Sequence, residues 1–227
     1  MIGSRKHFGK VEKRPHSPIL TMIGASMLWV GWFGFNGGSA LSAGTNAGMA
    51  ILVTHISAAV ASIVWMLIEK SRYGKSSLVG ITTGMVAGLA TVTPASGFIG
   101  VPGGIVLGLV GGVICYVVAD FLKGKIKVDD SLDVFAVHGV GGIIGTICVS
   151  FLALDSFSGA GLAEGTTYQA QLLTQFFGVI VTVIWTVIFT LIALMITKVF
   201  TDLRVDPKTE KEGLDEKAHG EIAYFND

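Results

Sequence analysis

Uncharged stretches of the chain alternate with short segments that carry all of its charges. Residues 15–68, 76–119, 134–154 and 165–197 contain no Lys, Arg, Asp or Glu. A membrane-spanning helix needs about 20 consecutive apolar residues, so the first two stretches are each long enough for two helices. Turn-forming residues interrupt them at 42–46 and 94–102. The pattern therefore predicts six transmembrane helices, at 18–41, 47–69, 77–96, 103–122, 133–154 and 170–198.

The composition agrees with an all-α polytopic membrane protein. The mean hydropathy is +0.68, and charged residues make up 14% of the chain, so nothing suggests a soluble domain. We expect a cytoplasmic N-terminal segment (1–17), a transmembrane helical domain (18–198) and a cytoplasmic C-terminal tail (199–227). Because the residues before the first helix are charged and a full-length helix follows, a cleaved signal peptide is not expected.

Basic residues indicate the orientation of the predicted helices. Cells keep Lys and Arg on the cytoplasmic side of short loops, and all 16 basic residues fall on one side of the six helices. The opposite loops carry only Asp155 and Glu164 as charged residues. Both termini should therefore be cytoplasmic, in a multi-pass protein of the cell membrane. The formal net charge of zero argues against nucleic-acid binding.

Glycines recur at helical spacing within the predicted helices. The chain has 31 glycines, and runs such as Gly80, Gly84 and Gly88 or Gly104, Gly108 and Gly112 recur every four residues. A stripe of glycines lets the backbone of a neighbouring helix approach closely. The spacing predicts a tightly packed bundle that can hold polar groups at fixed positions.

One polar and aromatic cluster lies in the first predicted helix. Trp32, Phe35, Asn36 and Ser39 follow i, i+3, i+4, i+7 spacing and share a helix face. Aromatic rings beside a hydroxyl can bind a small cation, at about 0.5–2 kcal/mol per ring. The alternative is a belt of aromatic residues at the membrane surface, which we prefer for Trp29.

His138 is the most informative single residue, because it lies within the uncharged stretch 134–154. Ionisable side chains inside a membrane usually belong to transport pathways. His55 also lies within a predicted helix. For His55 we expect a packed histidine that forms a hydrogen bond near Thr54 or Ser57.

Three separated segments carry a recognisable pattern: Trp32–Leu41, Leu132–Gly142, and the tail from Leu203 through Gly213-Leu214-Asp215 to His219–Tyr224. Together they resemble the ammonium transporter family (Amt/MEP/Rh), in particular its bacterial and archaeal Amt branch. The resemblance extends over essentially the whole chain, but it matches only the later part of such a transporter. About the first five helices of the family have no counterpart in this chain.

The resemblance implies an eleven-helix fold of two inverted five-helix repeats and a last helix, assembled as a homotrimer. The six predicted helices would correspond to the second repeat and the last helix. A conducting pore would then need the missing N-terminal half of the transporter as a partner. The chain would be either a fragment or a natural half-transporter.

The resemblance also implies roles for individual residues. Ser39 matches a serine that recruits ammonium at the outer vestibule, and Trp32 matches a tryptophan that lines the path. Phe35 matches one of two stacked phenylalanines that close the pore. His138 matches the second of two pore histidines. Desolvating NH4+ in an apolar pore is costly, and in the family the two imidazoles accept or transfer its proton.

At the cytoplasmic side, Asp130 precedes the helix that carries His138. A carboxylate there caps a helix, and the family has an aspartate near the inner mouth at this position. In the family the tail takes part in gating, with regulators of the PII type docking nearby. The tail residues that match are Gly213, Asp215, His219 and Tyr224.

The predicted function is therefore transport of ammonium or ammonia through an apolar, histidine-lined pore. The alternatives are an ammonium sensor or regulatory subunit, and a non-conducting truncated product. We expect no enzyme activity and no cofactor, because no HExxH motif or nucleophile paired with a base occurs in the predicted helices. Cys115 and Cys148 have no companions at metal-ligand spacing.

Overall fold

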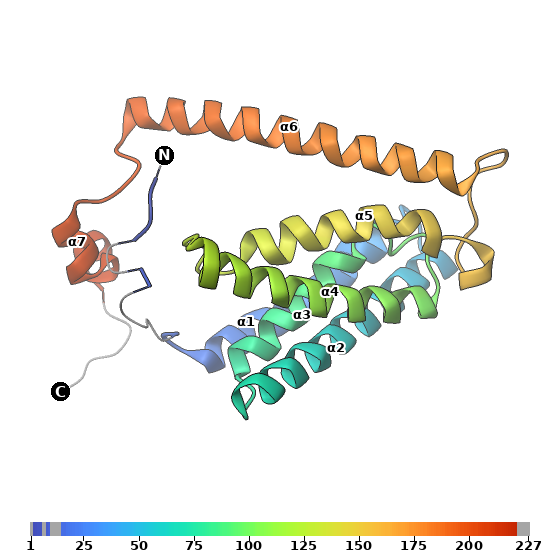
Figure 1. Ribbon diagram of the computed structural model, residues 1–227, viewed down its shortest axis with the longest axis horizontal. Coiled ribbons are helices and arrows are strands. Elements are labelled where there is room, and N and C mark those ends of the chain that lie inside the picture. The colour runs from blue at the N-terminus through green and yellow to red at the C-terminus, as the bar shows by residue number, and fades with distance from the viewer. Residues whose placement is uncertain (1, 6–7, 10–14, 222–227) are drawn as a thin grey trace. The chain divides into compact units, whose positions relative to one another are not determined.

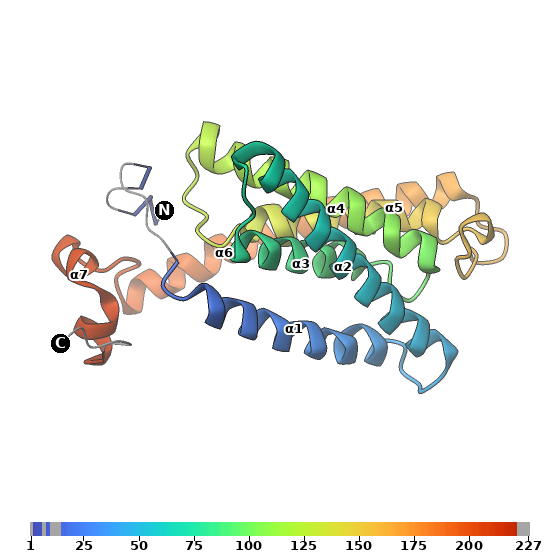
Figure 2. The ribbon, with the colours of Figure 1, turned by 90° about the horizontal axis from the view of Figure 1, so that it is seen from below.

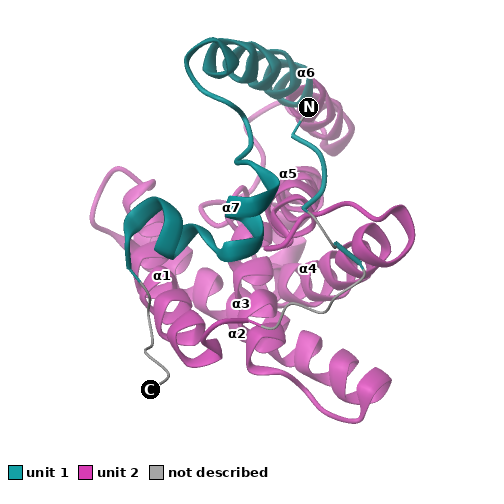
Figure 3. Cartoon of the chain, turned by 90° about the vertical axis from the view of Figure 1, so that its left-hand side faces the viewer, with its two compact units in different colours: residues 1–13, 181–227 teal, residues 14–180 magenta. Residues whose placement is uncertain are grey.

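The computed structural model describes residues 2–5, 8–9 and 15–221 of the chain. These form two compact units, one of residues 14–180 and one of residues 1–13 and 181–227 (Figure 3). Residues that contribute to the predictions above but lie outside the described residues are Lys6, Lys10, Lys13, Arg14 and Tyr224.

Helices make up both units (Figure 1). The unit of residues 14–180 contains α1 (Pro18–Gly38), α2 (Thr45–Tyr73), α3 (Leu78–Val92), α4 (Val101–Phe121), η1 (Leu122–Ile126), η2 (Phe135–Val140), α5 (Gly141–Leu152) and η3 (Asp155–Phe157). The other unit contains α7 (Pro207–Glu212) and η4 (Asp215–His219). Helix α6 (Tyr168–Phe200) begins in the first unit and continues without a break into the second.

The predicted all-α class is confirmed, because the described residues form helices, turns and loops but no strand. Each of the six predicted ranges contains an apolar helix. Within the part of the chain that the structure describes, five helices are long and apolar enough to cross a membrane, counting α4 with η1 and η2 with α5 as continuous helices. The sixth, α3, has only 15 residues, and turns follow it over residues 93–98. The chain is therefore a multi-pass membrane protein by helix length and composition.

Local sequence explains where several of these helices begin and end. The Ser17 hydroxyl accepts from the Leu20 N–H at the start of α1, and the Ser77 hydroxyl accepts from the Gly80 N–H at the start of α3. Helix α2 ends at Gly74, whose φ of 74° is left-handed. The loop after it is held by Glu69, which accepts from the Ser77 N–H at 2.6 Å.

Helix α2 packs against α1, α3 and α4 in the unit of residues 14–180. Figures 1 and 2 both show it beside α3 and α4. The predicted glycine stripes lie at these contacts. A Cβ on Gly84 would lie 2.8 Å from the Ala61 carbonyl oxygen, and one on Gly108 would lie 2.7 Å from that of Ser57. Both glycines permit backbone contact that no larger residue would allow.

Candidate functional site

The aromatic and polar cluster of α1 faces two neighbouring helices. The Trp32 indole Nε1–H donates to the Thr93 hydroxyl at the end of α3, at 2.8 Å. The Asn36 amide nitrogen donates to the Thr54 hydroxyl of α2, at 2.9 Å. Asn36 is only 3% exposed. These two hydrogen bonds fix the C-terminal half of α1 against α2 and α3.

The structure brings Trp32 together with His138, although they are far apart in the sequence. The indole and imidazole rings are almost parallel, with centroids 6.4 Å apart and an interplanar angle of 12°. Phe35 meets Trp32 edge to face, at a centroid distance of 6.3 Å. Three residues proposed from the sequence, Trp32, Phe35 and His138, therefore form one row of rings.

His138 is carried by a π-helical turn, η2 (Phe135–Val140), where hydrogen bonds span five residues instead of four. Such turns are rare and often occur at functional sites. Ala136 and Val137 are buried, at 0% and 2% exposure, against a cluster that includes Trp65. The backbone beside His138 is thus anchored in the core, while the imidazole itself is exposed in this chain.

The depth of the imidazole follows from its neighbour. His138 lies in the first turn of the helix Phe135–Leu152, which by itself would suggest the edge of a membrane. Trp32, however, lies well within α1 (Pro18–Gly38). Because the two rings stack, the imidazole lies alongside the interior of α1.

Asp130 lies just before η2. Its carboxylate oxygens accept from the backbone N–H groups of Val134 at 2.9 Å and Phe135 at 2.8 Å. This is the geometry of a helix N-terminal cap, in which a carboxylate also complements the helix dipole. Nearby, Lys123 forms an ion pair with Asp133 at 2.7 Å, which ties η1 to the segment before η2.

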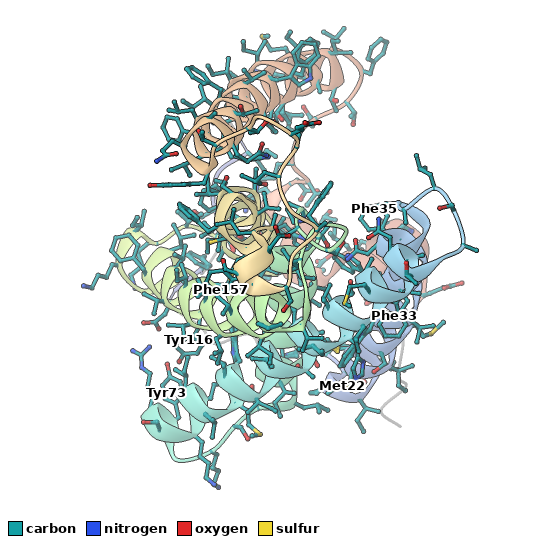
Figure 4. All side chains as sticks on the ribbon, turned by 90° about the vertical axis from the view of Figure 1, so that its right-hand side faces the viewer. Met22, Phe33, Phe35, Tyr73, Tyr116 and Phe157 are labelled. Atoms are coloured by element: carbon teal, nitrogen blue, oxygen red, sulfur yellow. The ribbon has the colours of Figure 1, made fainter. Side chains whose placement is uncertain are left out.

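Phe35 and Ser39 lie at the exposed side of α1. Phe35 is 60% exposed, and Figure 4 shows it and Phe33 on α1, across the bundle from Tyr73 and Tyr116. The Ser39 hydroxyl donates to the Phe35 carbonyl oxygen at 2.7 Å. Its lone pairs remain able to accept a hydrogen bond from a ligand.

His55 takes a different place from the one we expected. Its ring lies 5.2 Å from that of Trp29 and 6.0 Å from that of Phe33, and it is exposed. The Thr54 hydroxyl donates to Ala50 and the Ser57 hydroxyl to Gly88. Among the described residues no hydrogen bond joins His55 to either hydroxyl, so this expectation was wrong. Exposure next to large rings favoured aromatic contact over hydrogen bonding.

The tail belongs to the unit of residues 1–13 and 181–227. Gly213 ends α7 with a φ of 106°, a conformation that favours glycine. Asp215 and His219 are the first and last residues of η4. Arg204 forms an ion pair with Glu210 at 2.8 Å and donates to the backbone oxygens of Ile2 and Ser4.

Asp206 caps α7 at its N-terminal end. The Thr209 hydroxyl donates to the Asp206 carboxylate at 2.6 Å, and the backbone N–H groups of Lys208 and Thr209 donate at 2.9 and 3.1 Å. These hydrogen bonds, that of the Thr209 hydroxyl first, hold the pKa of the Asp206 carboxyl below its usual value.

Sequence reasoning missed two features of this site. Thr93, which accepts from Trp32, was not singled out, and Thr54, which accepts from Asn36, was considered only as a neighbour of His55. The available signal was a hydroxyl within an apolar stretch. The π-helical turn around His138 was also missed. Gly139, Gly141 and Gly142 around it mark a helix of low intrinsic stability, but glycine content alone does not predict a π turn.

Comparison with known proteins gives consistent matches. The model of the Ammonium Transporter Family matches residues 1–224. The chain is 46% identical over 224 residues to the ammonium transporter Amt1 of Archaeoglobus fulgidus, covering 98% of this chain and 56% of that protein. It is similar to a solved structure described as a sensor Amt protein, with a TM-score of 0.80, 35% identity, and coverage of 88% of this chain and 49% of the other.

Saccharomyces cerevisiae Mep2 is also similar, with a TM-score of 0.77, 33% identity, and coverage of 90% of this chain and 48% of the other. The chain thus spans about half the length of these relatives. Sequence and fold agree over nearly all of the chain, which therefore belongs to the Ammonium Transporter Family.

Proposed function

We propose that this chain transports ammonium across the cell membrane as one wall of an apolar pore. The observation that carries the proposal is the parallel stacking of Trp32 on His138 at 6.4 Å. It places an aromatic face and a proton-accepting imidazole next to each other within a helical bundle. A desolvated cation needs both kinds of group, one to replace hydration and one to take its proton.

The steps of transport follow from this row of rings. The Ser39 hydroxyl and the ring of Trp32 recruit NH4+ at the outer end of α1. Phe35, which meets Trp32 edge to face, closes the path between recruitment and the pore. His138 then accepts or relays the proton, because carrying a full charge through an apolar pore costs several kcal/mol.

The exposure of Phe35 and His138 supports the presence of a second wall of the pore, which this chain does not supply. Phe35 is 60% exposed and His138 is exposed in this chain, although both are suited to an enclosed path. The chain spans about half the length of its relatives, so the N-terminal half of the transporter is the partner we propose for this face. The six helices then form the second inverted repeat and the last helix.

Orientation and assembly extend the proposal. The basic residues favour cytoplasmic termini and six crossings, with Asp130 near the inner mouth as well as capping its helix. We propose a homotrimer of completed subunits. A PII-type regulator would dock at the cytoplasmic tail, where Gly213, Asp215, His219 and Tyr224 match the regulatory motif of the family.

The proposal is tested by ammonium uptake into vesicles that contain this chain alone, the N-terminal half of a relative alone, or both co-expressed. Uptake only with both halves is the expected result, because each half supplies one wall. No uptake in any sample, with both halves shown to be folded and associated, would contradict transport. That outcome would favour an ammonium sensor or a non-conducting product instead.

Ser39→Ala is expected to weaken recruitment of ammonium by the combined halves. The substitution removes one hydrogen-bond acceptor for NH4+, which is worth about 1 kcal/mol, so the KM for ammonium should rise about fivefold at nearly unchanged maximal rate. Ser26→Ala is the matched control, because the Ser26 hydroxyl donates to its own helix, α1, in the same way. An unchanged KM for Ser39→Ala would remove Ser39 from the recruitment site.

A further inference from the structure

We propose that Thr93 is a positioning residue, which holds the Trp32 ring parallel to the imidazole of His138. Trp32 is attached to α1, and its indole Nε1–H reaches across to the Thr93 hydroxyl of α3 at 2.8 Å. The indole has a single hydrogen-bond donor. With its backbone on one helix and its donor bound to another, the ring is held at both ends.

The hydrogen-bonding capacity of Thr93 fits this role. Its hydroxyl donates its only proton to the Leu89 carbonyl oxygen, at 2.7 Å. The oxygen is then left with two lone pairs, which accept from Trp32 at 2.8 Å and from Asn36 at 3.5 Å. Thr93 therefore acts toward α1 only as an acceptor. It has no proton left to offer a molecule in the path.

Thr54 repeats the arrangement one helix away. Its hydroxyl donates to the Ala50 carbonyl oxygen at 2.6 Å and accepts from the Asn36 amide at 2.9 Å. Threonines that bond the carbonyl four residues earlier have a fixed hydroxyl direction. Two such threonines, Thr54 on α2 and Thr93 at the end of α3, hold neighbouring turns of α1.

The support beneath Thr93 is rigid, as positioning requires. Its neighbours Val92 and Ala95 are both 0% exposed and belong to one core cluster. Pro94 restricts the backbone between them. Gly145 of α5 approaches this segment so closely that a Cβ there would lie 3.0 Å from the ring of Pro94.

Trp29 provides a contrast within the same helix. It also lies near a histidine, with its ring 5.2 Å from that of His55. Its indole Nε1–H is buried but has no hydrogen-bond partner among the described residues. The rings of this second pair are tilted by 30°, against 12° for Trp32 and His138. The pair with the threonine acceptor is the one whose rings are parallel.

The consequence is that Thr93 acts on transport through Trp32, an inference that rests on the proposed function. Thr93→Val keeps the shape of the side chain but removes the acceptor. The Trp32 ring is then free to rotate away from His138. Thr93→Ser restores the acceptor without the methyl group, so it should restore the ring orientation.

The test combines a spectroscopic and a transport measurement on this chain co-expressed with the N-terminal half of a relative. Tryptophan is labelled with 15N at the indole nitrogen and observed by NMR. The Trp32 N–H signal is assigned by its loss in Trp32→Phe. In the unsubstituted chain the Trp32 N–H should exchange with solvent about tenfold more slowly than the same group in a non-bonded indole. Thr93→Val should shift the signal and abolish that protection, and Thr93→Ser should restore both.

The rate of ammonium uptake should change in the same variants as the Trp32 signal. Thr93→Val is expected to lower the maximal rate of ammonium uptake about tenfold, and Thr93→Ser to return it to within about twofold of the original. The matched control is Thr83→Val, on the same helix, because the Thr83 hydroxyl makes the same bond to the carbonyl four residues earlier. It should change neither measurement.

The outcomes separate this inference from the proposed function. An unshifted Trp32 signal in Thr93→Val, or an unprotected Trp32 N–H in the unsubstituted chain, would overturn the positioning role whatever happens to uptake. A shifted signal with unchanged uptake would also overturn the effect on transport. If Thr93→Val does not fold, the protection measured in the unsubstituted chain decides. Absence of uptake in the unsubstituted assembly, with a protected Trp32 signal, would instead contradict the proposed function alone.

Discussion

His138→Ala is expected to lower the ammonium-evoked current of the combined halves by about a hundredfold, the lower range for loss of a residue that transfers a proton. The imidazole is the ionisable group that stacks on Trp32, so its loss removes the group by which this chain's wall of the pore takes the proton of a desolvated NH4+. Assembly should be unaffected, because the buried neighbours Ala136 and Val137 anchor the backbone. The current is measured in liposomes under an inward ammonium gradient.

His55→Ala is the matched control for this prediction. His55 also lies within an apolar helix and beside aromatic rings, those of Trp29 and Phe33. It is outside the row formed by Phe35, Trp32 and His138, so its removal should leave the current within about twofold. A His138→Ala assembly that carries the original current would show that the imidazole takes no part in transport.

Gly88→Leu should destabilise the helical bundle more than any other single change discussed for this chain. A Cβ on Gly88 would lie 2.8 Å from the Ala58 Cα and from the Ala61 Cβ, and closer still to the Ser57 carbonyl oxygen. Helices α2 and α3 would have to separate, at a cost of about 3 kcal/mol. Because α3 carries Thr93 at its end, both the amount of folded protein and its ammonium uptake should fall.

Gly24→Leu tests whether the effect depends on close packing. Nothing lies within 4 Å of a Cβ on Gly24, and leucine favours helix more than glycine by about 1 kcal/mol. This control should therefore be neutral or slightly stabilising. The measurement is the temperature at which the detergent-solubilised chain loses its single elution peak. Equal temperatures for the two variants would contradict the importance of the α2–α3 contact.

The fold was largely predictable from the sequence because the charged segments are so sharply separated. Uncharged stretches located a helix in each of the six ranges, and glycines at four-residue spacing indicated where helices touch. The end of α3 was predicted a few residues too late. The third range ran to residue 96, into the turn-forming stretch 94–102, because the uncharged stretch continues past Pro94, whereas the helix ends at Val92 and turns follow over 93–98.

The site was predictable only in part. Helical spacing grouped Trp32 with Phe35, Asn36 and Ser39, but the structure separates the group, with Asn36 buried and Phe35 exposed. A single helix cannot reveal which side its neighbours occupy. The stacking on His138 depends on contacts between distant segments, and the acceptor role of Thr93 depends on where its proton points. Neither can be read from spacing along one helix.

A double-substitution cycle of Trp32→Leu and His138→Ala tests most directly the central claim that these two rings act together on the ammonium path. The ammonium-evoked current is measured for the unsubstituted assembly, for each single variant and for the double variant. If the rings act as one unit, each single substitution lowers the current strongly. The double variant then carries no less current than the single variant with the lower current. Currents equal to the original in both single variants would contradict the claim.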